Sequence, residues 1–301
     1  MTRRSSDGVI LVQAIARPGQ ERSQPVVPRQ ENDTTSNLAR LLDLVSGALQ
    51  PPPGRRRILI ALSFGVLVHS VFVVAVLAMI LAMYFGMSQS LGTVPWPYAA
   101  AANALLLLQF PLVHSLLLTA RGGRWLAAMV PGSYGGTLST TTYAIIASLQ
   151  LLLLFALWTP SGIVWWRAEG WALVAVTGLY AASWLLLMKA SFDAGAEVQS
   201  GALGWLSMMQ DRKPRFPDMP TGGLFRVIRH PIYVAFALTL WTVPVWTPDQ
   251  LVLAVTLTAY CLLAPLLKER RFEARFGDRF RAYRQNVPYA LPSLRKVSDD
   301  E

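Results

Sequence analysis

The chain has 301 residues, of which 53% are hydrophobic and 15% are charged, and its formal net charge is +10. Soluble globular proteins carry about 25% charged residues, so the composition disfavours a soluble fold. The basic residues lie between long apolar runs rather than on one face beside aromatic readers, which argues against a nucleic-acid partner. The single cysteine, Cys261, excludes a disulfide framework and a paired-cysteine metal site within one chain, and we expect no metal.

Residues 1–55 are rich in proline, serine, glutamine and arginine, which predicts a mobile cytosolic tail. Five apolar residues inside it recur at helical spacing and end at Pro51. This pattern predicts a short amphipathic helix that lies on the membrane surface or on the protein itself. The five residues are Leu38, Leu41, Leu42, Val45 and Leu49.

Residues 56–301 are predicted to form one integral membrane domain. Apolar runs in it far exceed the roughly 20 residues that cross a bilayer once, so we predict an all-α, multi-pass transmembrane fold. The fifth and sixth spans are short and separated only by Pro248-Asp249-Gln250, which predicts a tight transmembrane hairpin. The six predicted spans cover about 58–85, 97–120, 138–158, 171–188, 231–247 and 251–267.

The distribution of basic residues tests this topology. With the N-terminus in the cytosol and six spans, 26 of the 27 Lys and Arg residues fall on the cytosolic side, and Arg167 falls outside. Short cytosolic loops and flanks are enriched in Lys and Arg in this way. Five or seven spans would scramble the pattern, so both termini are predicted to be cytosolic.

The approach to the fifth span is the first candidate for chemistry. Pro231 suits the first position of a helix, where its missing N–H has no partner to lose. The start of this helix would then be flanked by Arg226, Arg229 and His230, a combination that favours an anion. The alternative is that these side chains only reach out to lipid phosphates at the membrane surface.

The segment after the sixth span is the second candidate. Phe272, Phe276, Phe280 and Tyr283 follow each other at intervals of four, four and three residues, which predicts one face of a helix. Glu269 falls on the same face, and an inward carboxylate at the membrane boundary is unfavourable unless it is paired. The alternative is a purely structural ion pair with Arg226 or Arg229. The other basic residues expected to face solvent or lipid are Arg270, Arg271 and Arg281.

In this order and spacing, these elements resemble the C-terminal signature of the isoprenylcysteine carboxyl methyltransferase superfamily. That superfamily includes phospholipid N-methyltransferases, bacterial methanethiol S-methyltransferases, and the NnrU and nurim proteins. The resemblance is specific over about 221–292 and looser over about 109–160, where it is most similar to the methanethiol S-methyltransferase branch. The elements that carry it are Arg229-His230-Pro231-Ile232-Tyr233, Glu269, Phe276-Gly277-Asp278, Tyr283 and Val287-Pro288, with Gln109 and His114-Ser115 upstream.

The resemblance implies S-adenosylmethionine as cofactor, bound on the cytosolic side between the start of the fifth span and the C-terminal segment. It implies that His230 and Tyr233 contact its methionine or ribose part, that Glu269 accepts from hydroxyl or amino groups, and that Tyr283 closes over the adenine. His114 and Arg284 are the candidate catalytic residues, although His114 would equally suit a hydrogen bond between helices. The candidate cofactor-binding residues are Arg229, His230, Pro231, Tyr233, Glu269 and Tyr283.

Two departures from the family pattern bear on the acceptor. Ala235 stands where the family often has glycine, and Lys268-Glu269 stands where it often has paired glutamates. The sixth span has no arginine to neutralise a carboxylate acceptor, which disfavours a prenylcysteine substrate, whereas Lys268 could steer an anionic one.

We therefore expect methyl transfer from S-adenosylmethionine to a small or lipid-like acceptor, with a thiol favoured, in a protein surrounded by membrane lipids. We expect it to reside in a bacterial plasma membrane. The alternatives are carboxyl methylation of a prenylcysteine, N-methylation of a lipid amine, or a non-catalytic protein similar to nurim or NnrU. A transporter is disfavoured because the sequence shows no internal repeat.

Overall fold

The computed structural model describes residues 33–292, with side chains from residue 37 onward, so the tail predicted over 1–32 lies outside the described part. The described chain is helical apart from two strands of two residues each. This confirms the predicted all-α, multi-pass class. Five helices are long and apolar enough to cross a membrane: α2 (Arg55–Tyr84), α3 (Tyr98–Leu117), α5 (Gly135–Leu157), α6 (Gly170–Asp193) and α10 (Pro248–Phe276).

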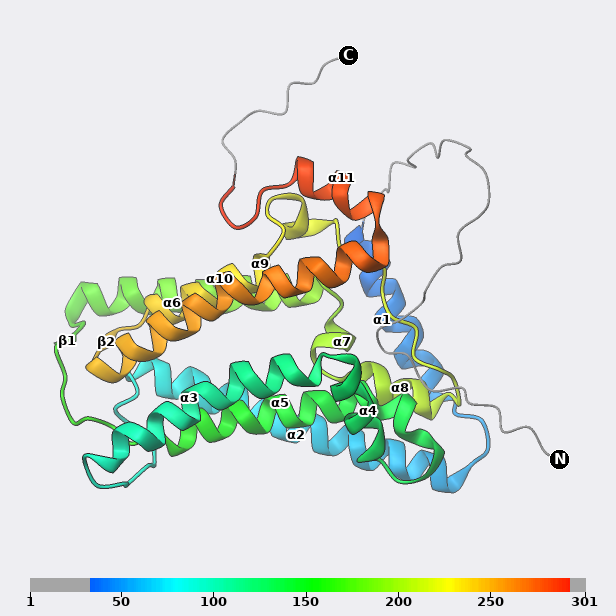
Figure 1. Ribbon diagram of the computed structural model, residues 1–301, viewed down its shortest axis with the longest axis horizontal. Helices are drawn as coiled ribbons and strands as arrows, with labels where there is room; N and C mark the ends of the chain where they lie inside the picture. Colours follow the sequence, from blue (N-terminus) through cyan, green and yellow to red (C-terminus); the bar gives the residue numbers. More distant parts are fainter. Residues whose placement is uncertain (1–32, 293–301) are drawn as a thin grey trace, which may run out of the picture.

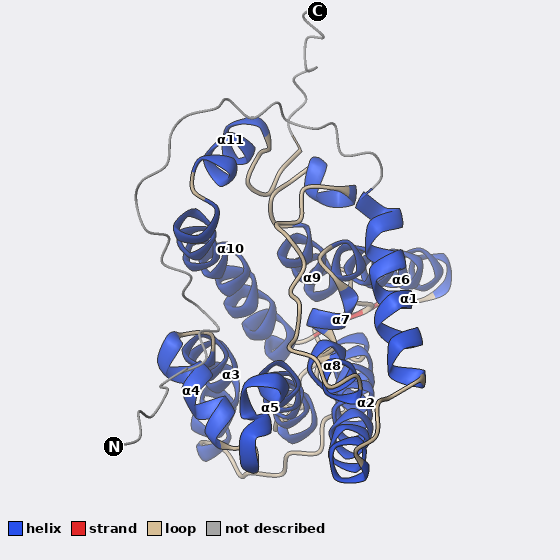
Figure 2. Ribbon diagram, turned by 90° about the vertical axis from the view of Figure 1, so that its right-hand side faces the viewer, coloured by secondary structure: helices blue, strands red, loops and turns tan. Residues whose placement is uncertain are grey.

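The long helices form two groups that lie side by side (Figures 1 and 2). One group holds α2, α3 and α5, and the other holds α6, α10 and the shorter apolar helix α9 (Pro231–Trp241). Helix α5 is the most buried of the spans, and α2 packs along much of its length. Small side chains allow this close approach, since Ala61 and Ala75 on α2 and Ala144 on α5 are all buried.

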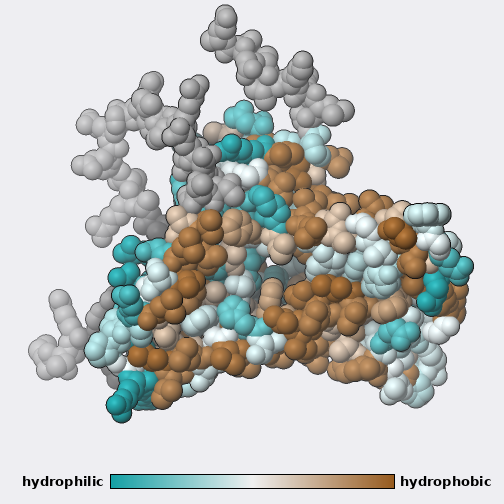
Figure 3. Space-filling view, turned by 180° about the vertical axis from the view of Figure 1, so that it is seen from behind, coloured by the Kyte–Doolittle hydropathy of each residue, from teal (hydrophilic) through white to brown (hydrophobic). Residues whose placement is uncertain are grey.

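The outer surface of the bundle is largely apolar, as Figure 3 shows for one face. Helix α6 is the least buried span and exposes side chains such as Trp171, Val174 and Leu185. In water such a surface would be unfavourable, whereas lipid tails match it. The exposed apolar faces are therefore the lipid-facing sides of the spans.

A two-stranded ribbon closes one end of the bundle (Figure 1). Strands β1 (Trp166–Arg167) and β2 (Val245–Trp246) pair antiparallel, with Trp166 opposite Trp246. Among residues 33–292, Arg167 is the only Lys or Arg at this end, and the remaining basic residues lie toward the end that holds α11. The structure thus separates the basic residues as the sequence predicts.

The hairpin between the fifth and sixth spans is built differently from the prediction. Residues 248–250 are not its turn, because α10 already begins at Pro248. The Thr247 hydroxyl accepts a hydrogen bond from the Gln250 N–H, a typical helix N-cap, and Pro248 takes the first helical position. The connection lies instead between Trp241 and Thr247 and includes β2.

The lone charge near this hairpin, Asp249, is buried and fully engaged. One oxygen accepts a hydrogen bond from the Trp158 indole at 3.0 Å, and the other accepts from the backbone N–H of Ser161 at 2.9 Å. A buried carboxylate with such partners is stabilised rather than isolated. Asp249 therefore fastens α10 to the loop after α5, at the end of the bundle opposite α11.

A helix, α1 (Asp33–Leu49), lies in the segment where the sequence predicts one. It packs against α8 (Ala202–Met209) and is held by Arg40, whose Nη2 lies 2.5 Å from Oε1 of Glu197. Ala48 is buried in this contact. The apolar residues of the predicted face point away from it, since Leu38, Leu42, Val45 and Leu49 are exposed.

The predicted continuous helix through residues 272–283 is wrong, because α10 ends at Phe276 and α11 (Asp278–Asn286) starts in a new direction. Gly277 makes the break with a φ of +53°, which favours glycine. The aromatic face nevertheless survives, since the rings of Phe272 and Phe280 lie 5.9 Å apart. The remaining short elements are α4 (Ala120–Ala128), η1 (Gly132–Tyr134), α7 (Ala196–Gln199) and η2 (Gly223–Arg226).

Candidate functional site

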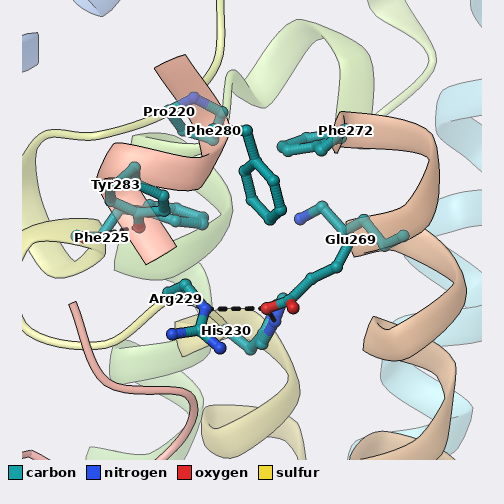
Figure 4. Close-up of a pocket in the computed structure, with 9 residues that line it drawn as sticks. Pro220, Phe225, Arg229, His230, Glu269, Phe272, Phe280 and Tyr283 are labelled. Atoms are coloured by element: carbon teal, nitrogen blue, oxygen red, sulfur yellow. Dashed lines mark hydrogen bonds and ion pairs between the residues drawn. The ribbon is translucent and has the colours of Figure 1, made fainter. Parts of the chain in front are cut away.

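A small cavity lies where the start of α9, the end of α10, and α11 meet (Figure 4). It is narrow, with room for about one water molecule between the side chains. Charged and polar groups form one part of its lining and aromatic rings the other. The lining residues are Pro220, Phe225, Arg229, His230, Lys268, Glu269, Phe272, Phe280 and Tyr283.

Glu269 is the carboxylate in the lining of this cavity, and it pairs with two other lining residues. Its Oε1 lies 2.8 Å from Nε of Arg229 and 2.8 Å from Nε2 of His230. Figure 4 shows the carboxylate reaching from α10 toward both partners. The sequence predicted that an inward carboxylate here needs a pair, and the structure supplies two donors for one oxygen. Arg226, the other predicted partner, is exposed.

His230 is buried and neutral at physiological pH. Burial lowers its pKa from 6.5 to about 4, and outweighs the hydrogen bond to Glu269, which raises the pKa. A neutral imidazole beside a carboxylate donates through Nε2, which leaves Nδ1 as an acceptor. Nδ1 is buried and has no hydrogen-bond partner among the described residues. The site therefore contains an acceptor ready for a donor group of a ligand.

The segment after α11 is attached to the start of α9 through Arg229. Its Nη1 donates to the carbonyls of Arg284, at 3.0 Å, and Val287, at 2.5 Å, and its backbone N–H donates to the carbonyl of Pro288 at 2.9 Å. Tyr283 adds a second link, because its hydroxyl donates to the Phe225 carbonyl at 2.7 Å. These bonds hold α11 over the cavity.

Lys268 lines the same cavity and faces aromatic rings. Its Nζ lies 5.2 Å from the centre of the Phe272 ring, 5.7 Å from Phe225 and 6.0 Å from Tyr233. No carboxylate lies within 4 Å of it among the described residues. The sequence pointed to Lys268 as a departure from the family pattern that could steer an anionic acceptor.

Four of the predicted cofactor-binding residues line this cavity: Arg229, His230, Glu269 and Tyr283. The other two lie beside it. Pro231 is buried at the first position of α9. The ring of Tyr233 lies 6.0 Å from that of His230, so α9 brings it next to the cluster without making it part of the lining.

The two candidate catalytic residues lie elsewhere. The Arg284 side chain is 42% exposed and lies 3.2 Å from Oε2 of Glu273, so only its backbone carbonyl meets the cluster. His114, near the end of α3, is 2.7 Å from the hydroxyl of Tyr143 on α5, which is the bond between helices that the sequence left open. Neither side chain lines the cavity.

Arg271 differs from its predicted orientation toward solvent or lipid. It is partly buried, and its positive charge lies within electrostatic range of His114, Tyr143 and Tyr233. The sequence could not show this, because the groups near Arg271 come from α3, α5 and α9, which are far from it along the chain. The sequence also did not predict that Pro220, Phe225 and Lys268 line the cavity. Their spacing along the chain gives no indication of it.

Together, the fold and the cavity define a multi-pass α-helical membrane protein with a candidate ligand site at one end of its bundle. Comparison with known proteins identifies its relatives. A methanethiol S-methyltransferase of Pseudomonas deceptionensis is 31% identical over 202 residues, which cover 67% of this chain and 76% of that protein. One from Mycobacterium tuberculosis is 30% identical over 200 residues, covering 66% and 80%.

The chain therefore belongs to the methanethiol S-methyltransferase family, as the signature predicted, and it is a membrane enzyme that transfers methyl groups. It is also similar to nurim of Mus musculus, at 32% identity over 178 residues, which cover 54% of this chain and 64% of that protein. The chain matches no protein-family model and no solved structure.

Proposed function

We propose that the protein methylates the sulfur of a small thiol and that S-adenosylmethionine is the methyl donor. The observation that carries the proposal is the Arg229–Glu269–His230 cluster in a chain whose relatives are named methanethiol S-methyltransferases. Carboxyl methylation is less well supported, because no arginine stands inside the span of α10 ahead of Lys268 to receive a carboxylate acceptor.

The residues of the cavity fit this donor. S-adenosylmethionine offers a carboxylate, an ammonium, ribose hydroxyls and an adenine ring. Glu269 and the unpartnered Nδ1 of His230 can accept hydrogen bonds from its amino and hydroxyl groups. The guanidinium of Arg229 suits a carboxylate, and the rings of Phe272 and Phe280 offer apolar walls for the adenine.

Methyl transfer needs alignment and a dry site more than acid–base groups. When bound, the donor supplies an electrophilic methyl group on a positively charged sulfur. The chain's own residues then hold the reactants: Arg229 and His230 fix the position of Glu269, and Tyr283 keeps α11 over the cavity. With the donor bound, this arrangement would restrict the access of water and hold the donor in one orientation.

We also propose that the cavity opens to the cytosol and that both termini are cytosolic, because the basic residues gather at the α11 end. The bacterial relatives favour the plasma membrane. In this proposal residues 1–55 form a cytosolic tail that carries α1, and residues 56–301 form the membrane methyltransferase domain.

The direct test is methyl transfer by the purified full chain in lipid nanodiscs. Isotopically labelled S-adenosylmethionine would be offered with a small alkanethiol, a prenylcysteine or a lipid amine. We expect label in the thioether product of the alkanethiol only. Label in the prenylcysteine ester or the methylated amine instead would reject the thiol assignment.

Donor binding without transfer to any acceptor would favour a non-catalytic protein similar to nurim, consistent with that similarity. Two variants connect the assay to the cavity: Glu269→Ala and His230→Ala should each weaken donor binding. Glu273→Ala is the matched control, because this carboxylate pairs with Arg284 outside the cavity. Equal donor binding by all three variants would reject the proposed site.

A further inference from the structure

The ammonium of Lys268 is a positive charge without a paired negative one. The nearest carboxylate along the chain, Glu269, directs its Oε1 to Arg229 and His230. Burial and the like charge of Arg271 oppose the charged form of Lys268, and the carboxylate of Glu269 favours it. A cation that faces a cavity under these conditions attracts an anion.

Three aromatic rings hold this ammonium in place. Phe272, Phe225 and Tyr233 lie 5.2, 5.7 and 6.0 Å from Nζ, within the range of cation–π attraction. The rings come from α10, η2 and α9, so three separate elements fix the position of one charge. They position the ammonium without neutralising it.

We propose that Lys268 binds the acceptor as its thiolate and is a catalytic residue of methyl transfer. This inference rests on the proposed function. The thiolate, not the thiol, is the sulfur nucleophile. An alkanethiol is largely protonated at neutral pH, so a fixed positive charge beside its sulfur favours ionisation where the reaction occurs.

The step balances with the groups already named. The thiol proton leaves to water as the acceptor binds, and Lys268 stays protonated throughout. A lone pair of the thiolate then forms the new S–C bond, and the bond between the methyl carbon and the donor sulfur breaks. Its electron pair stays on the donor sulfur, which becomes a neutral thioether. The negative charge beside Lys268 disappears, which helps the neutral product to leave.

The position of Lys268 favours the acceptor over the donor's carboxylate. Arg229 and His230 stand on the Glu269 side of the cavity, where polar groups of the donor find partners. One of the three rings around Lys268, that of Tyr233 on α9, lies within electrostatic range of Tyr260 and Cys261, which precede Lys268 in α10. On this side the ammonium borders the part of α10 that lies in the membrane, where a small apolar thiol dissolves.

The test compares Lys268→Met, Lys268→Arg and Arg270→Met in the full-length protein in nanodiscs. Arg270 is exposed on the same helix, so its variant is a control for the loss of one positive charge. Two acceptors are used at saturation, ethanethiol and the more acidic trifluoroethanethiol. Donor affinity is measured separately by calorimetry with S-adenosylmethionine alone.

For Lys268→Met we expect kcat with ethanethiol to fall about 100-fold, and to rise with pH because the bound thiol now ionises only in alkali. With trifluoroethanethiol, which ionises without help, the loss should be about tenfold or less. Donor affinity should change by less than about threefold. Lys268→Arg should keep most of the activity, and Arg270→Met should match the wild type.

Other outcomes overturn the inference in distinguishable ways. An unchanged kcat in Lys268→Met, with an active wild type, would reject the role of Lys268 and leave the proposed function standing. A loss of donor affinity equal to the loss of activity would assign the ammonium to the donor's carboxylate instead. A wild-type protein that binds the donor and methylates neither thiol would reject the proposed function and this inference together.

Discussion

Arg229, immediately before the cap of α9, reaches Glu269 in α10 with 2.8 Å between Nε and Oε1, and each side chain is only 11% exposed. This pair joins segments 40 residues apart along the chain. Arg229 also holds the carbonyls of Arg284 and Val287. Arg229 therefore holds both Glu269 in the lining of the cavity and the segment that covers the cavity.

Replacing Glu269 by alanine should lower the free energy of unfolding by about 3 kcal/mol, because the variant leaves the Arg229 guanidinium without its buried partner. Thermal unfolding in detergent measures this loss. Glu273→Ala removes a carboxylate that forms only exposed pairs with Arg281 and Arg284, and should change stability by about 0.5 kcal/mol or less. Equal losses in the two variants would contradict the buried ion pair.

His230 should make stability depend on pH. Its pKa is about 4 in the folded protein and 6.5 ordinarily, so between these values the unfolded chain binds a proton that the folded protein does not. The free energy of unfolding therefore falls as the pH drops from 6.5 to 4, and this contribution levels off below 4. The variant His230→Gln has no imidazole at this position and therefore lacks this pH-dependent contribution.

The measurement is thermal unfolding of both proteins at pH 7 and pH 5. Groups that do not contact His230 titrate equally in the two proteins, so the difference between them reports His230 and its partner Glu269. We expect the stability of the wild type relative to His230→Gln to be smaller at pH 5. A difference that stays constant would mean that His230 titrates near its ordinary value.

His114 remains a predicted acceptor contact, and its bond to Tyr143 provides the test. Tyr143→Phe removes the hydroxyl 2.7 Å from Nε2 and frees the imidazole to reorient. If His114 contacts the acceptor, KM for the thiol should rise several-fold while donor affinity stays the same. If the bond only joins α3 to α5, the variant should lose about 1 kcal/mol of stability, with unchanged KM.

The spans could be predicted from the sequence because bilayer thickness and charge placement act on long segments. Helix α5 begins at Gly135 and ends at Leu157, close to the predicted 138–158. The turn of the hairpin could not be predicted as accurately as the spans, because its geometry depends on the pairing of β2 with β1. That pairing joins residues that are far apart along the chain and leaves no local signal.

The site could be predicted in part for the same reason. His230 and Pro231 mark a helix start by local rules, and an inward carboxylate at Glu269 demands a partner whatever the fold. The environment of Lys268 needed the structure, since its three rings come from three elements. The Arg284 side chain lies on the outer side of α11. This orientation depends on the turn of the chain at Gly277, which the sequence pattern did not predict.

Asp249 allows stability to be separated from activity. Asp249→Ala removes the acceptor for the Trp158 indole and for the N–H of Ser161, which should lower the free energy of unfolding by about 2 kcal/mol. The residue lies in the first turn of α10, directly after β2, whereas the cavity lies at the other end of α10. Donor affinity below the unfolding temperature should therefore match the wild type. A large loss of affinity would mean that the two ends of the bundle are coupled.

Gly277 should be the position where backbone geometry controls the cover of the cavity. A Cβ there would meet no other atom within 4 Å, so a substitution acts only through the backbone conformation at φ +53°. Gly277→Ala should lower the free energy of unfolding by about 1–2 kcal/mol, and weaken donor binding because α11 carries Phe280 and Tyr283.

Gly178→Ala is the matched control: its Cβ also meets nothing within 4 Å, but it lies within α6 at an ordinary helical φ. Alanine suits a helix better than glycine by about 1 kcal/mol, so this control should be neutral or stabilising, with unchanged donor affinity. Donor binding that survives Gly277→Ala while stability falls would mean that α11 is not needed to hold the donor.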